Sequence, residues 1–548
     1  MNTFRKLLKP AELPYDFDDW KKLPFTDRAR QICQVWATQG FGAPMAVYAF
    51  YILKIAFYIY VWFFFCSFST NLGTFANIET WWFKLDALYK AIFWTILIES
   101  IGLGGASGPL TGRYIPPMGG ILYFLRPKTI KIPLFPNAPI VGGDSRNVID
   151  MALYAAFLFY LVRNCIAPHI EVENVLPIVI LFPLLGVLDR TIFLSARGDI
   201  YFPAACCFLI PSDTIPALKI LWYAIWFWAA FSKLTPSFTS VVCVMISNSP
   251  VFQSKWLRKK LFHNYPDDLR PCKPATYISH FGTVVEFVLP FLLITSSNPS
   301  VIFFALIGIA IFHTFITLNV PMGVPIEWNI ITVFGAFVLF WNFQAIPILS
   351  LSNPFLISLF VVLLFLVPLL GNFFPKYISF LMSMRYYAGT WAYSVWFFKP
   401  EALDTLEKKI TKTSPALLKQ LLFLYDKKTA EALLSRIIAF RTMHLPGRAL
   451  HSLLHKAITH LDDYVWMDGE FIAGEVVGWN FGDGHLHSET LLASIQKRCN
   501  FPSGNLRCIF VESPTLHKQE MSWRIYDAKD GKLEEGIINL RELKEQLP

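Results

Sequence analysis

Long apolar runs, nearly free of charged residues, occupy the first two thirds of the chain. Runs of this kind predict membrane-spanning helices, each of which needs about 20 mostly apolar residues. Nine clear runs lie at 44–68, 85–103, 148–167, 175–194, 218–231, 277–295, 301–319, 330–347 and 354–370. A further run at 201–215 is short and contains Pro203 and Pro211, so it predicts a bent crossing or part of a broken helix.

Basic residues are concentrated in alternate connections between these runs. Segments 107–147 and 235–274 are rich in Lys and Arg, as is the N-terminal segment 1–39, while the opposite connections have almost none. Because basic loops stay on the cytoplasmic side, these segments and the Lys-bearing C-terminal region should share that side. Nine crossings cannot achieve this, so we expect about ten. The pattern predicts a multi-pass protein of the cell inner membrane with both termini cytoplasmic.

The pattern changes after residue 371. An aromatic stretch at 379–398, interrupted by Arg385 and Gly389, predicts an interfacial helix, and 401–460 predicts amphipathic helices. From 462 onward, short runs separated by turn residues indicate an α+β module. The module should contain 464–477, a helix at 488–498, strands at 506–512, 522–527 and 533–540, and a hairpin turn at Asp530-Gly531.

The predicted fold is therefore an all-α polytopic membrane domain of about ten transmembrane helices, followed by a small soluble α+β domain. We divide the chain into a cytoplasmic arm (1–40), the membrane domain (41–371), interfacial and amphipathic helices (372–460) and the soluble domain (461–548). Aromatic residues of the arm, such as Trp20, are expected to rest at the membrane surface.

Composition supports the membrane assignment. Of 548 residues, 54% are hydrophobic and 16% are charged, against roughly 25% charged in ordinary soluble proteins. Mean hydropathy is +0.45. The net charge of +9 is spread along the chain without a dense Lys/Arg tract, so membrane lipids, and not nucleic acid, are the expected partners. Nine scattered cysteines without a CxxC pair indicate no disulfide framework, and no cofactor is indicated.

Ionisable residues inside the apolar runs are the main candidates for chemistry. Glu286 and His313 lie near the middles of 277–295 and 301–319, where a charge is costly, so we expect them in a pocket or a proton path. Glu327 and Trp328 follow a Pro/Gly-rich turn, where a carboxylate can also simply favour the start of a helix. Lys233 ends an aromatic helix, where it can act as a desolvated base or reach the interface.

Two resemblances bear on these residues. The motifs GPLTGRYIPPMGG, GVPIEWN and WNFGDGHLHSE resemble, over nearly the full length, an uncharacterised bacterial multi-pass transmembrane family, a domain of unknown function. The pattern aromatic-x-x-Ala-x-x-x-Lys, followed by Glu286 and His313, is similar to the horizontally transferred transmembrane family that includes the vitamin-K-dependent gamma-carboxylases. That resemblance implies that Lys233 is a base that deprotonates a reduced quinone, but it does not extend to protein carboxylation.

Two glycine-rich segments carry further candidates. Within 102–120, Arg113 would supply fixed charge to a ligand headgroup, or the segment is a flexible connection. Within 478–489, His485 and His487 would project to one face of an extended segment, and Asp483 or Glu489 could complete a divalent-metal site. The alternative is a loop in which the same side chains hold a turn by hydrogen bonds.

Three functional hypotheses follow. In the first, Glu286, His313, Glu327 and Lys233 perform acid/base chemistry on a lipid-soluble substrate, a quinone or polyisoprenoid, with Arg113 and Trp328 as substrate-binding candidates. In the second, the acidic and histidine side chains relay protons in a transporter or permease. In the third, the protein is a scaffold that recruits partners through its C-terminal domain.

Overall fold

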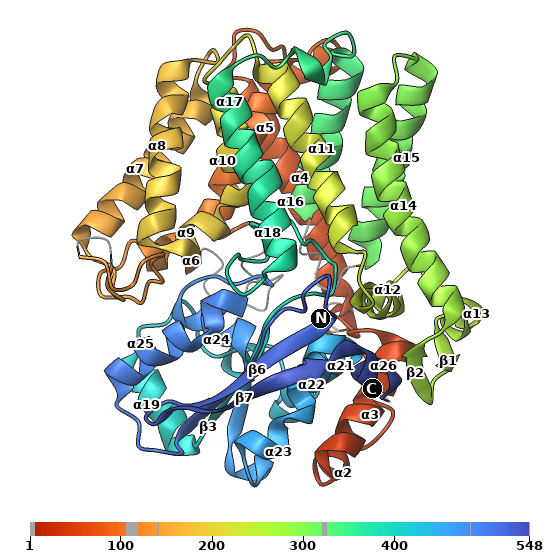
Figure 1. The fold of residues 1–548 in the computed structure, drawn as a ribbon, viewed down its shortest axis with the longest axis vertical. Coiled ribbons are helices and arrows are strands. Elements are labelled where there is room, and N and C mark those ends of the chain that lie inside the picture. Colours follow the sequence, from red (N-terminus) through yellow and green to blue (C-terminus); the bar gives the residue numbers. More distant parts are fainter. Residues whose placement is uncertain (1–5, 106–118, 140–141, 320–325, 483, 547–548) are drawn as a thin grey trace.

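The protein consists of a helical layer and a second layer built around a β-sheet, and the helices near both ends of the described chain lie in the second layer (Figure 1). The computed structural model describes residues 6–105, 119–139, 142–319, 326–482 and 484–546. Six of the described helices are long and apolar enough to cross a membrane: α4 (Met45–Cys66), α7 (Val148–Ile166), α11 (Thr214–Ser232), α14 (Lys273–Thr295), α15 (Pro299–Asn319) and the continuous Pro354–Phe373, which comprises α17, η6 and α18.

Other helices of the layer are shorter. They are α5 (Leu85–Ser100), α8 (Val172–Leu188), α9 (Arg190–Ser195), α10 (Gly198–Cys207), α12 (Ser237–Asn248) and α16 (Ile326–Ala336), which continues into the π-helical segment η4 (Phe337–Asn342). A multi-helix membrane protein is thus confirmed, but a count of ten spans is not. Segment 201–215 forms the second half of α10, a turn and the first residues of α11.

The outer surface of the helical layer is apolar, as contact with lipid requires. On α15, for example, Phe304 and Ile311 are each 66% exposed, while Ile302 and Leu306 on the opposite face are buried. Exposed apolar surface on this scale is unfavourable in water and neutral in hydrocarbon. The helices α14 and α15 form a hairpin at one side of the layer (Figure 1).

The N-terminal segment differs from the expected solvated arm. Helices α2 (Phe17–Lys21) and α3 (Phe25–Gln39) are folded, and Trp20 and Trp36 are 4% and 1% exposed. Helix α3 packs against α12 and α21 (Lys427–Met443). The aromatic residues therefore belong to a core and do not rest on the membrane surface. The basic segment 235–274 likewise contains the buried helix α12, in addition to α13 (Lys255–Lys259), β1 (Phe262–Asn264) and β2 (Asp268–Pro271).

The C-terminal sheet is antiparallel, with strand order β4-β3-β5-β6-β7. Strands β5 (Leu506–Val511), β6 (Glu520–Asp527) and β7 (Gly531–Asn539) and helix α25 (Glu489–Cys499) confirm the elements expected there. In the β6–β7 hairpin, Asp527 faces Gly531, whose φ of +82° suits a turn glycine. The interfacial helix expected at 379–398 is wrong: Tyr393–Phe398 is β3, fully buried between β4 (Val465–Asp468) and β5.

Short helices surround this sheet. They are α19 (Pro400–Lys409), α20 (Leu417–Leu421), α22 (Leu445–Ser452), α23 (Leu454–Ala457), α24 (Gly469–Val476) and α26 (Leu540–Glu545). A second antiparallel pair, β1 and β2, lies apart from the main sheet. The expected amphipathic helices of 401–460 are thereby present. Helices α19, α22 and α23 share one core with the strands, whereas α20 and α21 contribute to separate clusters.

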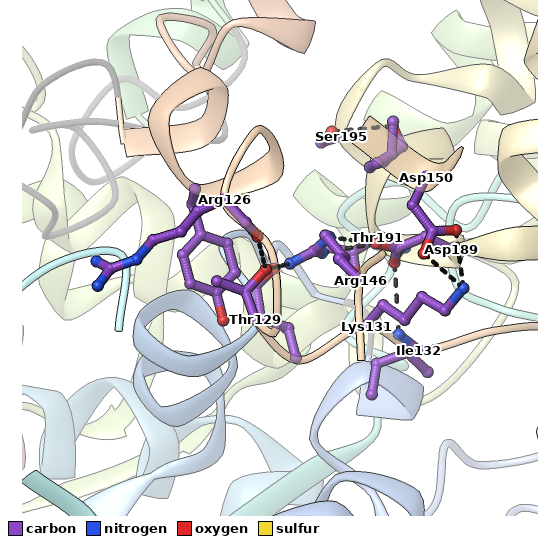
Figure 2. Close-up of polar contacts among 12 residues, drawn as sticks. Arg126, Thr129, Lys131, Ile132, Arg146, Asp150, Asp189, Thr191 and Ser195 are labelled. Atoms are coloured by element: carbon purple, nitrogen blue, oxygen red, sulfur yellow. Dashed lines mark hydrogen bonds and ion pairs between the residues drawn. The ribbon is translucent and has the colours of Figure 1, made fainter. Parts of the chain in front are cut away.

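Two buried ion pairs stabilise the junction between the layers (Figure 2). Arg146 Nη2 lies 2.6 Å from Asp189 Oδ2, and Lys131 Nζ lies 2.8 Å from Asp150 Oδ1. Arg146 also donates to Thr129 Oγ1 and to the carbonyl of Val477 in the C-terminal region. Both pairs of Arg146 and Asp144 are long-range: Arg146 pairs with Asp189, and Asp144 pairs with Lys497 and Arg498 of α25.

Candidate functional site

A cavity of about 630 Å³ lies between α11, α12, α14, α15 and α16. Most of its wall is apolar. Three of its lining residues, Phe281, Phe304 and Ile311, are also 66–71% exposed on the outside of α14 and α15. The same cavity receives Lys233, Glu286, His313 and Trp328, four of the residues singled out from the sequence. It therefore combines an apolar, lipid-facing wall with a small set of convergent polar groups, as hydrophobic-ligand sites do.

Lys233 and Glu286 form a buried ion pair on this wall. Lys233 caps the C-terminal end of α11, Glu286 lies in α14, and the lysine Nζ donates to Glu286 Oε2. Their side chains are 6% and 5% exposed. The rings of Phe238 and Phe312 lie 5.6 and 5.9 Å from Nζ. Lys233 thus points inward to a carboxylate and does not extend to the interface, so two charges that are costly to desolvate compensate each other.

His313 is held by hydrogen bonds at both ring nitrogens. Asn329 Nδ2 donates to Thr317 Oγ1 at 2.7 Å, which turns Asn329 Oδ1 toward His313 Nδ1 at 2.8 Å. Nδ1 must therefore carry the proton, because an amide oxygen only accepts. Nε2 accepts from Trp226 Nε1 at 3.0 Å. The imidazole is neutral with one tautomer favoured, and its remaining lone pair is already engaged.

Glu327 faces away from the cavity. It is completely buried, and its Oε1 lies 2.6 Å from Nζ of Lys54 on α4. Its neighbour Trp328 lines the cavity and donates from Nε1 to Glu99 Oε1 on α5 at 2.6 Å. Lys54, Glu99 and Glu327 form a second buried cluster, in which both carboxylates interact with the one ammonium. Glu327 therefore does not join Glu286 and His313 at the cavity. Trp328 lies between the two sites, because it lines the cavity and donates to Glu99 of the second cluster.

Arg197 is a cavity residue that the sequence analysis missed. It precedes α10 in a left-handed backbone conformation (φ 54°, ψ 47°) and is 1% exposed. Its guanidinium pairs with Asp199 through Nε and Nη2 at 3.1 and 3.0 Å and lies 3.6 Å from the ring centroid of Trp328. Asp199 also accepts from the hydroxyl of Tyr386. The signal in the sequence was Arg-Gly-Asp between two apolar runs, where neither charge could remain unpaired.

The remaining candidates are not brought to the cavity. Arg113 and Asp483 lie outside the described residues. His485 and His487 lie in a 3₁₀ turn, η8 (Gly484–His487), and not in an extended segment. His487 Nδ1 contacts Ser394 Oγ at 2.6 Å, whereas His485 Nε2 lies 3.5 Å from Glu512 Oε1. Burial lowers the pKa of His487 to about 4. No group of three or more His, Cys, Asp or Glu side chains suited to a metal ion occurs among the described residues.

The apolar helices and the polar groups buried between them define a multi-pass membrane protein. A family model described as "Transmembrane protein of unknown function (DUF3556)" matches residues 6–548, and the chain belongs to this family. No curated protein and no solved structure matches the chain. The full-length resemblance to an uncharacterised transmembrane family is thereby confirmed, whereas a relationship to the gamma-carboxylases is not shown.

Proposed function

We propose that the protein is a membrane enzyme that admits an uncharged, lipid-soluble substrate of the quinone or isoprenoid class to this cavity. The observation that carries the proposal is the Lys233–Glu286 ion pair in the wall of a 630 Å³ apolar cavity. Structural ion pairs are usually enclosed by packed side chains. Here the pair borders open space whose outer wall, at Phe304 and Ile311, faces lipid, so a hydrophobic molecule can reach it from the bilayer.

The pair is suited to acid/base chemistry at an O–H group, such as that of a reduced quinone or of an isoprenoid alcohol. The Glu286 carboxylate can accept the proton when the substrate O–H bond breaks, and the Lys233 ammonium, hydrogen-bonded to the carboxylate, can stabilise the oxyanion left on the substrate. The low dielectric of the apolar wall strengthens both interactions. We assign His313 a positioning role, because its Nε2 lone pair is engaged by Trp226 and its Nδ1 proton by Asn329.

We further propose that the protein lies in the inner membrane with both termini cytoplasmic. Helices α3 and α26, near the two ends of the described chain, belong to one layer (Figure 1). The basic segments 119–139 and 255–273 contact that layer through Tyr123, which donates to the carbonyl of Val476, and through Arg270, which pairs with Glu545. An even number of crossings, ten if α5, α8, α10 and α16–η4 all cross, is consistent with this arrangement. Determining the accessibility of single cysteines placed in connections on either side, in a cysteine-depleted background, tests it.

Lipid retention tests the proposed substrate class. The protein is purified in mild detergent, and its bound small molecules are identified by native mass spectrometry and extraction. The variant Lys233→Met/Glu286→Leu removes both charges at similar side-chain volume. The matched control, Lys131→Met/Asp150→Leu, does the same to a buried pair away from the cavity. We expect a quinone or isoprenoid species in the parent and the control but not in the cavity variant. Equal retention of bulk phospholipid alone by all three would contradict the proposal.

A second candidate function, proton-coupled transport, is favoured by the cluster of Lys54, Glu99 and Glu327. Two buried carboxylates share one ammonium, so a proton on one of them would remove the excess negative charge. Such groups inside a membrane are characteristic of proton relays. In proteoliposomes containing a pH-sensitive dye, transport predicts proton flux that Glu327→Gln abolishes. Flux indistinguishable from protein-free vesicles would exclude it.

A further inference from the structure

Two hydrogen-bond donors beside the cavity have no partner. Arg197 Nη1 and the hydroxyl of Tyr387 are both buried, and neither has a hydrogen-bond partner within the described ranges of the chain. Both residues line the cavity, and Tyr387 packs against Phe481, whose ring also contacts the Trp328 that covers Arg197. A buried polar group without a partner costs roughly 1–3 kcal/mol. Two such donors bordering one cavity favour a bound ligand that completes them.

We propose that Arg197 and Tyr387 form a subsite for an acceptor oxygen on an uncharged lipid, namely a carbonyl of a quinone or of a glycerolipid ester. This subsite rests on the function proposed above: a quinone belongs to the substrate class named there, and a glycerolipid ester is a second source of the same carbonyl group.

The contacts of Arg197 engage Nε and Nη2 of its guanidinium and leave Nη1 for a ligand. Nε and Nη2 are occupied by the two carboxylate oxygens of Asp199, and Asp199 is itself fixed by the Tyr386 hydroxyl. Trp328 covers the plane of the guanidinium, with 3.6 Å between its ring centroid and Arg197 Cζ. Because the guanidinium is planar and held on three sides, Nη1 has a fixed direction. A donor that is already oriented binds an acceptor oxygen with little loss of side-chain entropy.

The charge balance of the cavity favours a neutral ligand. Arg197 is paired with Asp199, and Lys233 is paired with Glu286, so the four charges cancel. A phosphate or carboxylate would add a charge without a counterion in an apolar space, which is strongly unfavourable. A carbonyl oxygen needs only N–H and O–H donors, and Arg197 Nη1 and Tyr387 supply them. The apolar remainder of the cavity, with Leu289 and Phe304 in its wall, suits a hydrocarbon tail.

Binding of defined probes to the full chain tests the subsite. Delipidated protein in mild detergent is titrated with decylubiquinone, dioctanoylglycerol and, as the anionic probe, dioctanoyl phosphatidic acid, and bound fractions are measured by native mass spectrometry. We expect at least one of the uncharged probes to give a much larger bound fraction than phosphatidic acid. The uncharged probe that binds more tightly identifies the source of the carbonyl. Tyr387→Phe should weaken that binding roughly five- to tenfold.

A matched variant separates binding from folding. Because the Tyr387 hydroxyl has no partner within the described ranges, Tyr387→Phe should leave the thermal midpoint unchanged or higher. Tyr386→Phe loses a hydrogen bond to Asp199 and should lower the thermal midpoint. Arg197→Lys, which keeps the charge but not the planar donor, is a second binding test. If the parent binds an uncharged probe and Tyr387→Phe and Arg197→Lys bind it equally well, the subsite is refuted while the cavity proposal stands. If the parent binds neither uncharged probe, the subsite is refuted, and so is the quinone class of the proposed function.

Discussion

Breaking the Lys233–Glu286 pair on one side should destabilise the protein far more than removing both charges. In Glu286→Gln, the Lys233 ammonium stays 6% exposed between Phe238 and Phe312 without a carboxylate. Losing one partner of a buried ion pair costs about 3–5 kcal/mol. In Lys233→Met/Glu286→Leu, no charge remains to be desolvated, and such replacements range from neutral to about 1–4 kcal/mol stabilising.

The cysteines of the chain provide the assay. Eight of the nine are buried and all are free, so a thiol-reactive fluorophore reports unfolding as the protein is heated. For a chain of 548 residues, the unfolding entropy is about 1.1 kcal/mol/K, and a loss of 3–5 kcal/mol lowers the midpoint by roughly 3–5 °C. We expect this fall in Glu286→Gln and a recovered midpoint in the double variant.

In the same variants, retention of the lipid-soluble substrate should change independently of stability. The double variant is expected to unfold like the parent and yet retain no lipid-soluble substrate, because the groups that would contact it are gone. If Glu286→Gln and the double variant both unfold like the parent, the two side chains are not a desolvated pair, and the assignment of the site is wrong. If the double variant is as unstable as Glu286→Gln, the loss of stability is caused by packing and not by charge.

Three further predictions concern the rest of the fold. Arg146→Met leaves Asp189 buried and unpaired (Figure 2), so limited proteolysis at the junction between the layers should be at least tenfold faster than in the parent. Burial lowers the pKa of His444 and His487 to about 4, against about 6.5 when unfolded. The unfolded chain therefore binds protons first, and stability should be full above pH 6.5 and fall by about 2 kcal/mol per histidine by pH 5. Thermal midpoints across pH 7 to 5 check this, and His444→Gln/His487→Gln should flatten the curve. Gly389→Ala should lower the midpoint by a few degrees, because φ is +72° and a Cβ would lie 2.3 Å from Val241; an unchanged midpoint would show that the loop adapts.

Apolar length predicted the six long apolar helices, and short runs between turn residues predicted the last three strands, because both depend on local pattern. Glu286 and His313 were identified by the same logic, since a charge or an imidazole inside an apolar run has few structural reasons to be there. Their convergence with Lys233 on one cavity depends on how α11, α14 and α15 pack. The sequence pattern indicates which residues are unusual but not which of them meet.

The failures have a common physical cause. Segment 379–398 has an aromatic composition that suits either an interfacial helix or a buried strand, and β3 is a strand because β4 and β5, 70 to 120 residues later in the chain, pair with it. Glu327 was grouped with Glu286 because it stands at the start of an apolar run, but the direction of its side chain toward Lys54 depends on the rotation of α16. Arg197 was overlooked because the two aromatic rings that contact its guanidinium, those of Trp328 and Tyr386, are far away in sequence.

An electron cryomicroscopy map of the protein in discs of its native membrane tests the central claim most directly. The account predicts elongated density between α11, α14 and α15 that is not attributable to the chain, with its polar end within hydrogen-bonding distance of Lys233–Glu286 or Arg197–Tyr387 and its tail along Phe304. Helices packed closely together in place of the cavity, or annular lipid outside α14 and α15 with none between them, would contradict it.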